Sequence, residues 1–211
     1  MRKITLVCSS HREKGLCNAQ ELLRILRAID PAVIFEEVRQ SDFDIYNTTS
    51  LEGQAATRFL ALKSLQRVPV DRYDLPPNFR ALTDSAFDFV EQHSHEYRFL
   101  HDQSESDTHL HGFMYLNSAT FAKVMARMAE IEDETINREG NPDLVRALAT
   151  WRQVIQGREK AMVENIYRYC RENIFETGVF LVGAAHRSGI VKAIEEAPHP
   201  EAELLEWILY L

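Results

Sequence analysis

The long stretch from about residue 78 to residue 174 shows helical patterns alone, whereas alternating strand and helix patterns flank it on both sides. Before it, apolar runs at 4–8 and 32–35 enclose a segment with helical periodicity. After it, an apolar run at 179–182 and the segment 203–211, which ends in an apolar run, enclose a second such segment. A strand, a crossover helix and a second strand form a parallel unit, so both ends of the chain belong in a parallel sheet.

These patterns predict one α/β domain over residues 1–211. We expect a largely parallel central sheet built from N- and C-terminal β-α-β units, with a helical insertion at about 78–174 in the middle. The 211 residues are 45% hydrophobic, which is enough for one buried core. The further expected elements are helices at about 50–65, 79–101, 117–138, 142–173 and 188–196, a short strand at 67–71 and a polar loop at 101–112.

Charge and hydropathy exclude several kinds of partner. The net charge is −8 and no dense run of Lys and Arg occurs, so we expect no nucleic-acid partner. No apolar run is long enough to span a membrane, and the run at 4–8 is shorter than a signal peptide needs. Cys8, Cys17 and Cys170 lack the spacing of a zinc site, and free thiols are typical of a cytoplasmic protein.

Two of the predicted strands are each followed by a histidine, a few residues beyond the end of the strand. His11 comes just after the first strand and His186 just after the late strand. Glu36 and Glu37 end the second strand, and Asp71 ends the third. Because ligands bind beyond the carboxyl ends of parallel strands, these side chains predict a site at one edge of the sheet. Two imidazoles with two or three carboxylates could bind a divalent metal ion or share acid–base chemistry.

Other polar residues have two interpretations each. Arg158 lies in the helix predicted at 142–173, where it either belongs to a solvated charged face or points to the sheet edge and binds an anionic group of the substrate. His109 and His111 lie in the predicted polar loop, where two side chains two residues apart could share a face. A lone histidine or glutamate at a strand end is also an ordinary loop residue.

The motifs resemble those of the erythromycin esterase / ChaN / TraB–Tiki superfamily, in particular its TraB-like branch. Residues 183–186 match the second Gly-x-x-His motif of that branch, and residues 8–11 match the first with cysteine in place of glycine. The spacing from Pro31 to Glu37 and the arginine-led helical segment 158–166 are also similar. The resemblance implies a largely parallel sheet with a helical insertion. Activities differ among members, which include metal-dependent proteases, metal-independent esterases and a haem-binding branch.

The resemblance and the clustered side chains together lead us to expect a hydrolase that cleaves an ester, amide or peptide bond in a small molecule or peptide, with or without a divalent metal ion. The candidate catalytic residues are His11, Glu36, Glu37, Arg158 and His186. The candidate metal ligands are His11, Glu37, Asp71 and His186. Which of the two adjacent glutamates acts is left open.

Two other functions are compatible with the sequence. The hydroxyl-rich loop at 9–15 precedes a helix, which is typical of a phosphate- or flavin-phosphate-binding protein of flavodoxin type. The helical insertion could instead be the lid of a non-catalytic ligand-binding module. The insertion is rich in aromatic side chains, which form either ordinary core or the interface of a homo-oligomer: Phe87, Phe89, Phe99, Phe113 and Tyr115.

Overall fold

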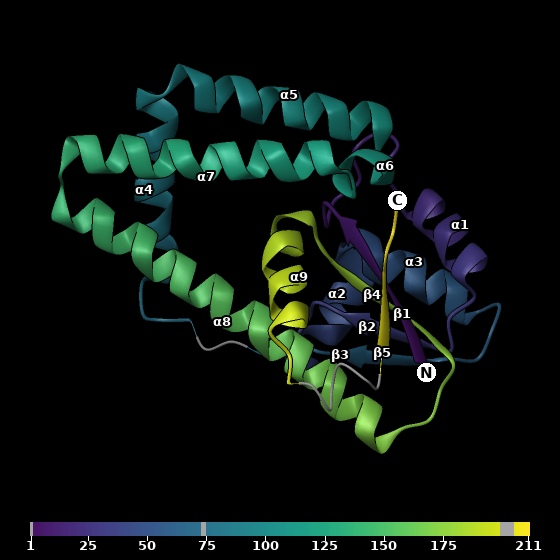
Figure 1. Ribbon diagram of the computed structural model, residues 1–211. Coiled ribbons are helices and arrows are strands. Elements are labelled where there is room, and N and C mark those ends of the chain that lie inside the picture. The colour runs from purple at the N-terminus through teal and green to yellow at the C-terminus, as the bar shows by residue number, and fades with distance from the viewer. Residues whose placement is uncertain (1, 73–74, 199–204) are drawn as a thin grey trace.

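A computed structural model of the chain describes residues 2–72, 75–198 and 205–211. Five strands of these residues form one parallel sheet in the order β3-β2-β4-β1-β5. The strands are β1 (Arg2–Ser9), β2 (Val33–Glu36), β3 (Gln66–Pro69), β4 (Thr177–Gly183) and β5 (Leu205–Leu209). The predicted α/β fold with a parallel sheet and a helical insertion is therefore confirmed (Figure 1).

Helices cover both faces of the sheet. Helix α1 (Ala19–Ile29) packs beside α3 (Leu51–Leu60) on one face. Helix α8 (Pro142–Glu172) packs beside α9 (Arg187–Glu195) on the other face (Figure 1). Right-handed crossovers give this arrangement, because the chain moves from β1 through β2 to β3 and then, from β3 onward, moves back through β4 to β5.

The three central strands form the main core. Most side chains of β1, β2 and β4 are less than about one-tenth exposed, on both faces of each strand. This double burial explains why these strands appear in the sequence as continuous apolar runs instead of alternating ones. Cys8, Cys17 and Cys170 are buried free thiols, as predicted.

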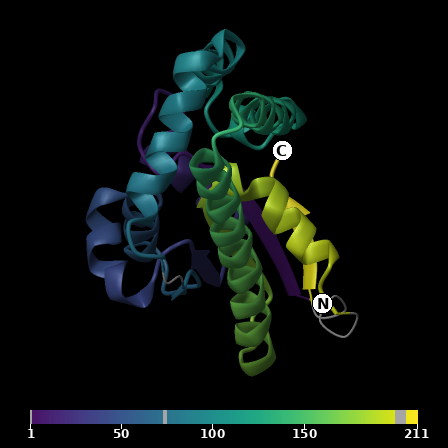
Figure 2. The ribbon, with the colours of Figure 1, turned by 90° about the vertical axis from the view of Figure 1, so that its left-hand side faces the viewer.

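The insertion stands beyond the edge at which the strands end. It consists of α4 (Phe79–His93), α5 (His95–His111), α6 (Phe113–Leu116), α7 (Ala119–Glu139) and the first half of α8 (Figures 1 and 2). It has a small core of its own, formed by Ala86, Val90, Ile131, Ile136, Ala147 and Leu148. At its near end the insertion joins the main core through α6 and the start of α7, with Phe113, Tyr115, Leu116 and Phe121.

The predicted elements were wrong in two places within the insertion. The helix expected at 79–101 is divided at Ser94, whose hydroxyl accepts a hydrogen bond from the Tyr97 amide and begins a new helix. The loop expected at 101–112 is the second half of α5. Within this helix Thr108 is the buried residue, so the segment has no apolar stripe from which a helix could be recognised.

Other boundaries agree more closely or extend the prediction. A short 3-10 helix (Gln40–Asp42) and α2 (Phe43–Thr49) were not predicted. The strand expected at 203–211 is β5, and residues 203–204 lie outside the described residues. None of the described helices has both the length and the apolar character that crossing a membrane requires.

Candidate active site

The strand order decides which loops meet at the carboxyl edge of the sheet. Strand β4 lies between β2 and β1, and its last residue, Gly183, is level with Ser9 of β1. His11 follows β1, Glu37 follows β2 and His186 follows β4. The two histidines come from opposite ends of the chain, yet their strands are hydrogen-bonded neighbours.

Glu37 lies at the centre of the group. Its carboxylate is 5% exposed and contacts both imidazoles: Oε2 is 3.3 Å from His11 Nε2, and Oε1 is 3.1 Å from His186 Nε2. The Gly183 amide donates to Oε2 at 2.7 Å, and Arg158 Nη2 donates to Oε1 at 2.8 Å. Four groups therefore share the two oxygens of this one carboxylate.

Each histidine is also held on its other ring nitrogen. His11 Nδ1 is 2.9 Å from Glu52 Oε1, and His186 Nδ1 is 3.0 Å from Glu159 Oε1. Each imidazole is thus placed between Glu37 and a second carboxylate. The two pairs form a pseudo-symmetric arrangement, His11 with Glu52 and His186 with Glu159, around the shared Glu37.

The sequence prediction missed both outer carboxylates. Each occupies the first position of a buried helical stripe with the spacing i, i+3, i+4 and i+7. On α3 the stripe is Glu52, Ala55, Ala56 and Phe59, and on α8 it is Glu159, Met162, Val163 and Ile166. A carboxylate in an apolar stripe must find a partner inside the protein. That pattern could have identified both residues.

Of the two positions considered for Arg158, a solvated charged face and the sheet edge, the structure shows the second. Its guanidinium binds Asp71 as well as Glu37, with Nη2 2.8 Å from Asp71 Oδ2 and Nε 3.4 Å from Asp71 Oδ1. The side chains of Asp71 and Glu37 are 2% and 5% exposed. Arg158 therefore joins the end of β3 to the end of β2 and balances two buried charges.

Glu36 does not contact either histidine. It is fully buried and receives two hydrogen bonds from Arg67, at 2.8 Å and 2.7 Å. Burial raises the pKa of Glu36 to about 7, although Arg67 acts to lower it. Successive side chains of a strand point to opposite faces, so of the two adjacent glutamates it is Glu37 that reaches the histidines.

The carboxylates of the cluster favour the protonated form of both imidazoles. Burial lowers the pKa of His186, but hydrogen bonds to Glu159 and Glu37 outweigh it and raise the pKa to about 9. Desolvation likewise opposes the charge on His11, and its bonds to Glu37 and Glu52 hold the pKa well above the usual range. Burial alone would raise the pKa of Glu37, yet the two histidines hold it well below the usual range.

The cluster forms the floor of a cleft of about 600 Å³ between the sheet edge and the insertion. Its floor contains His11, Glu37, Arg158 and His186. The insertion lines the cleft with polar side chains of α5 (His101, Ser104, Glu105 and Thr108) and with apolar side chains of α6 to α8. The apolar ones are Leu116, Phe121, Met125, Met128, Trp151 and Ile155. His11 has the most open position, with 43% of its side chain exposed against 9% for His186.

The loop that carries His11 is fixed at both of its ends. At the end of β1, the buried Asn117 side chain accepts a hydrogen bond from the Cys8 amide at 2.9 Å and donates to the Cys8 carbonyl at 3.0 Å. Farther along, the Leu16 amide donates to the His109 carbonyl at 2.9 Å. The insertion thus holds the loop from both sides and places His11.

The start of α1 is already occupied by side chains of the chain itself. Asn18 Oδ1 accepts hydrogen bonds from the amides of Gln20 and Glu21, and Glu13 accepts from the Ala19 amide at 3.0 Å. These amides are the donors that a phosphate would use at a helix N-terminus. Their occupation weighs against the phosphate-binding interpretation of the loop at 9–15.

The geometry fits a divalent metal ion poorly. The oxygens of Glu37 accept hydrogen bonds from Arg158 and Gly183, and a cation there would lie beside the Arg158 guanidinium. Asp71, another candidate ligand, binds Arg158. Over the described residues, no group of three or more His, Cys, Asp or Glu side chains has an arrangement suited to a metal ion. The metal ion stays a prediction.

The other predicted histidine pair does not form a site. His109 and His111 lie two residues apart on helix α5, so their side chains point in different directions, contrary to the shared face expected of a loop or strand.

Comparisons of the chain with protein-family models, with curated proteins and with solved structures find no match.

Proposed function

We propose that the protein is a hydrolase that activates water with His11 and Glu37, without a metal ion, to cleave an ester or related acyl bond. The observation that carries this proposal is the position of Glu37 between two histidines, each bound on its other nitrogen by a second carboxylate. Paired imidazoles and carboxylates at the floor of a cleft are the groups that acid–base catalysis requires.

His11 is the general base in this proposal. Its side chain is the more exposed of the two histidines, and Glu52 binds Nδ1. The base is the neutral form of His11, in which Nδ1 keeps the proton and the lone pair of Nε2 faces Glu37 Oε2, and two acceptors cannot form a hydrogen bond with each other. A water molecule on the cleft side of this pair can donate a hydrogen bond to His11 Nε2, which orients it and makes it a better nucleophile. Because Glu37 and Glu52 hold the pKa of His11 well above its usual range, this form is the minor one near neutral pH, and turnover should rise as the pH is raised.

The reaction then needs one proton transfer in each direction. As the water oxygen forms a bond to the acyl carbon, His11 Nε2 takes the proton of that water. The tetrahedral intermediate collapses, the bond from carbon to the leaving oxygen breaks, and His11 returns the proton to this oxygen. The products are a carboxylic acid, which ionises in water, and an alcohol.

Positive charge for the intermediate comes from the opposite side of Glu37. Arg158 and the protonated His186 both bind Glu37 Oε1, at 2.8 Å and 3.1 Å. They balance Glu37 in the resting site and remain next to the position where negative charge develops. Such fixed charges in a partly buried site stabilise a transition state more strongly than they would in water.

The test is turnover of a panel of p-nitrophenyl esters, lactones and short peptides. We expect His11→Gln and Glu37→Gln each to lower kcat/KM by about 10²- to 10⁴-fold. His93→Gln is the control, because His93 is exposed and does not line the cleft. Equal turnover in all three variants contradicts the proposal, as does ligand binding without turnover in the wild type, which is the behaviour of a binding module.

The metal-dependent version is tested separately. Elemental analysis compares the untreated wild type with the double variant His11→Ala/His186→Ala, and turnover is measured before and after treatment with a chelator. We expect the chelator to leave turnover unchanged. Loss of activity with the chelator, restored by one divalent ion, would replace the metal-free mechanism by one in which the same residues bind a metal.

A further inference from the structure

The two histidine–carboxylate pairs differ in their access to solvent. Glu52, the partner of His11, is fully buried, and its Oε2 atom has no hydrogen-bond partner and no contact with solvent. Glu159, the partner of His186, lines a groove of about 300 Å³ between α8 and α9. One pair is closed behind the site and the other reaches a second opening.

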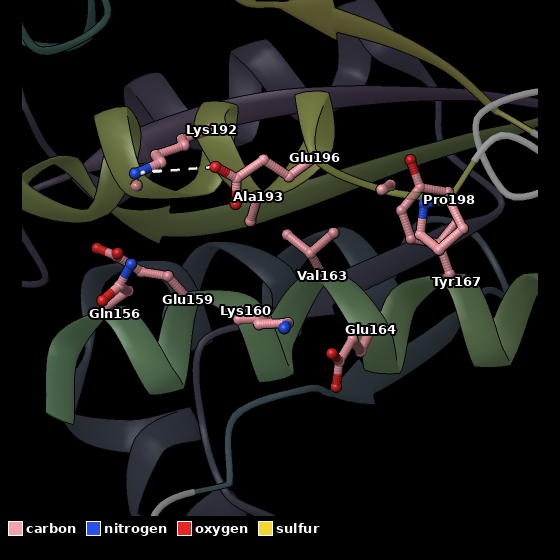
Figure 3. A pocket seen from close by; sticks show the side chains of 12 residues that line it. Gln156, Glu159, Lys160, Val163, Glu164, Tyr167, Lys192, Ala193, Glu196 and Pro198 are labelled. Carbon is pink, nitrogen blue, oxygen red and sulfur yellow. Dashed lines mark ion pairs between the residues drawn. The ribbon is translucent and has the colours of Figure 1, made fainter. Parts of the chain in front are cut away.

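Glycine at position 189 makes room for Glu159 beside α9. A Cβ atom placed on Gly189 would lie 1.8 Å from Glu159 Oε2, far closer than a carbon and an oxygen that are not bonded to each other can approach. The second oxygen of Glu159 therefore extends into the gap between the two helices, while the first binds His186 Nδ1 at 3.0 Å. Figure 3 shows Glu159 at one end of this groove, with α8 on one side and α9 on the other.

The groove can hold water beside this carboxylate. Its floor is partly apolar, with Val163, Tyr167 and Ala193, and its rim carries both signs of charge, with Lys160, Glu164, Lys192 and Glu196 (Figure 3). Its volume leaves room for several water molecules next to a polar rim. His186 itself is 7% exposed and has carboxylates on both ring nitrogens.

We propose that Glu159 is a proton relay that connects His186 to water in the α8–α9 groove, so that His186 exchanges its proton on the side away from the substrate cleft. His186 Nδ1 gives its proton to Glu159 Oε1, which leaves a neutral imidazole and a carboxylic acid. A half-turn of the carboxyl group carries the proton to the groove side, where water accepts it. The reverse sequence protonates His186 again.

The relay matters when the cleft is full. A substrate on the cleft floor covers His11 and His186 on that side, because both line the same cleft. The route through Glu159 lets His186 keep the protonation state set by the solvent during turnover. This consequence rests on the proposed function, whereas the exchange route itself does not.

The test measures the exchange of the His186 Nδ1 proton with water by NMR of protein labelled with ¹⁵N-histidine. Ala193→Trp fills the groove without a change in the cluster, and Glu159→Gln keeps a hydrogen-bond acceptor for Nδ1 but cannot carry a proton. We expect both to slow the exchange at least about tenfold. Glu195→Trp is the matched control, since it adds the same side chain on α9 outside the groove.

The outcomes separate the relay from the proposed function. Unchanged exchange in a folded Ala193→Trp protein overturns the relay, whether or not the protein hydrolyses esters. Slowed exchange in Ala193→Trp and Glu159→Gln, with normal exchange in Glu195→Trp, supports it even if no substrate in the panel is cleaved. If esters are cleaved, Ala193→Trp should leave kcat and KM close to those of the wild type, because His11 carries both proton transfers and the substrate cleft is intact.

Discussion

Gly183 and His11 are in direct contact across β4 and the loop after β1, and the space that the glycine leaves is filled by the imidazole. A Cβ atom at position 183 would lie 2.4 Å from His11 Nε2, the nitrogen that faces Glu37. The same residue donates its amide to Glu37 at 2.7 Å. The glycine of the Gly-x-x-His motif thus positions the histidine that follows the other strand.

Gly183→Ala should therefore reduce activity much more than stability. The added methyl group pushes His11 toward the open cleft, and a displacement of about 1 Å at a catalytic group can cost about 100-fold in rate. A small shift keeps His11 within reach of Glu37 and Glu52, so we expect the free energy of unfolding to fall by about 1–3 kcal/mol, the usual range for overpacking. Turnover and urea denaturation measure the two effects.

Gly157→Ala is the control for this substitution. Gly157 lies in helix α8 with no atom within 4 Å of the added Cβ. Alanine in a helix interior is favoured over glycine by about 0.5–1 kcal/mol, so this variant should be more stable than the wild type and equally active. An equal loss of activity in both variants would contradict the contact between Gly183 and His11.

Removal of Arg158 should destabilise the fold strongly. Arg158→Ala leaves Glu37 and Asp71 buried without their shared counter-ion, and breaking a buried ion pair costs about 3–5 kcal/mol. Arg146→Ala removes another arginine of α8, whose side chain is 74% exposed and pairs with the exposed Asp143, and it should cost at most about 1 kcal/mol. Similar losses for both in chemical denaturation would show that Arg158 is not the counter-ion described above.

Asn117→Ala should affect both stability and the site. The variant leaves the amide and carbonyl of Cys8 buried without partners, because Asn117 binds both of them. An unsatisfied buried backbone group costs about 1–3 kcal/mol, so we expect a loss of about 2–4 kcal/mol. Hydrogen exchange at the Cys8 amide should become faster in the variant. Protection equal to that of the wild type would mean that another group replaces the asparagine.

The stability of the protein should fall in mildly alkaline solution because of His186. Its pKa of about 9 in the folded state lies above the value of about 6.5 for an unfolded histidine, so protonation favours folding. This contribution is fully present below about pH 6.5 and is lost as the pH rises through about 9. The difference corresponds to roughly 3 kcal/mol.

Urea denaturation at pH 6 and pH 9.5 tests this expectation with wild type and His186→Gln. The wild type should lose roughly 3 kcal/mol more than the variant between the two pH values. Cysteine titration in the unfolded chain affects both proteins alike, so it cancels from the comparison. A parallel loss in both proteins would show that the stabilisation does not come from His186.

The sequence by itself determined the elements at the two ends of the chain and the polar residues that follow their strands. Apolar β-branched runs are local patterns, and a histidine after such a run marks the carboxyl end of a strand wherever that strand lies in the sheet. The same local reasoning failed for α5, since a helix in which Thr108 is the buried residue has no apolar face to detect.

Only the tertiary structure decided which of these groups meet. The order β2-β4-β1 brings residues from both ends of the chain to one carboxylate, and strand order depends on pairings between segments far apart in the sequence. The choice between Glu36 and Glu37 depends on which face of β2 the next residue reaches, and a strand buried on both faces carries no alternation to reveal it. Glu52 and Glu159 become partners of the histidines because their helices pack on opposite faces of the sheet with their polar positions toward its edge.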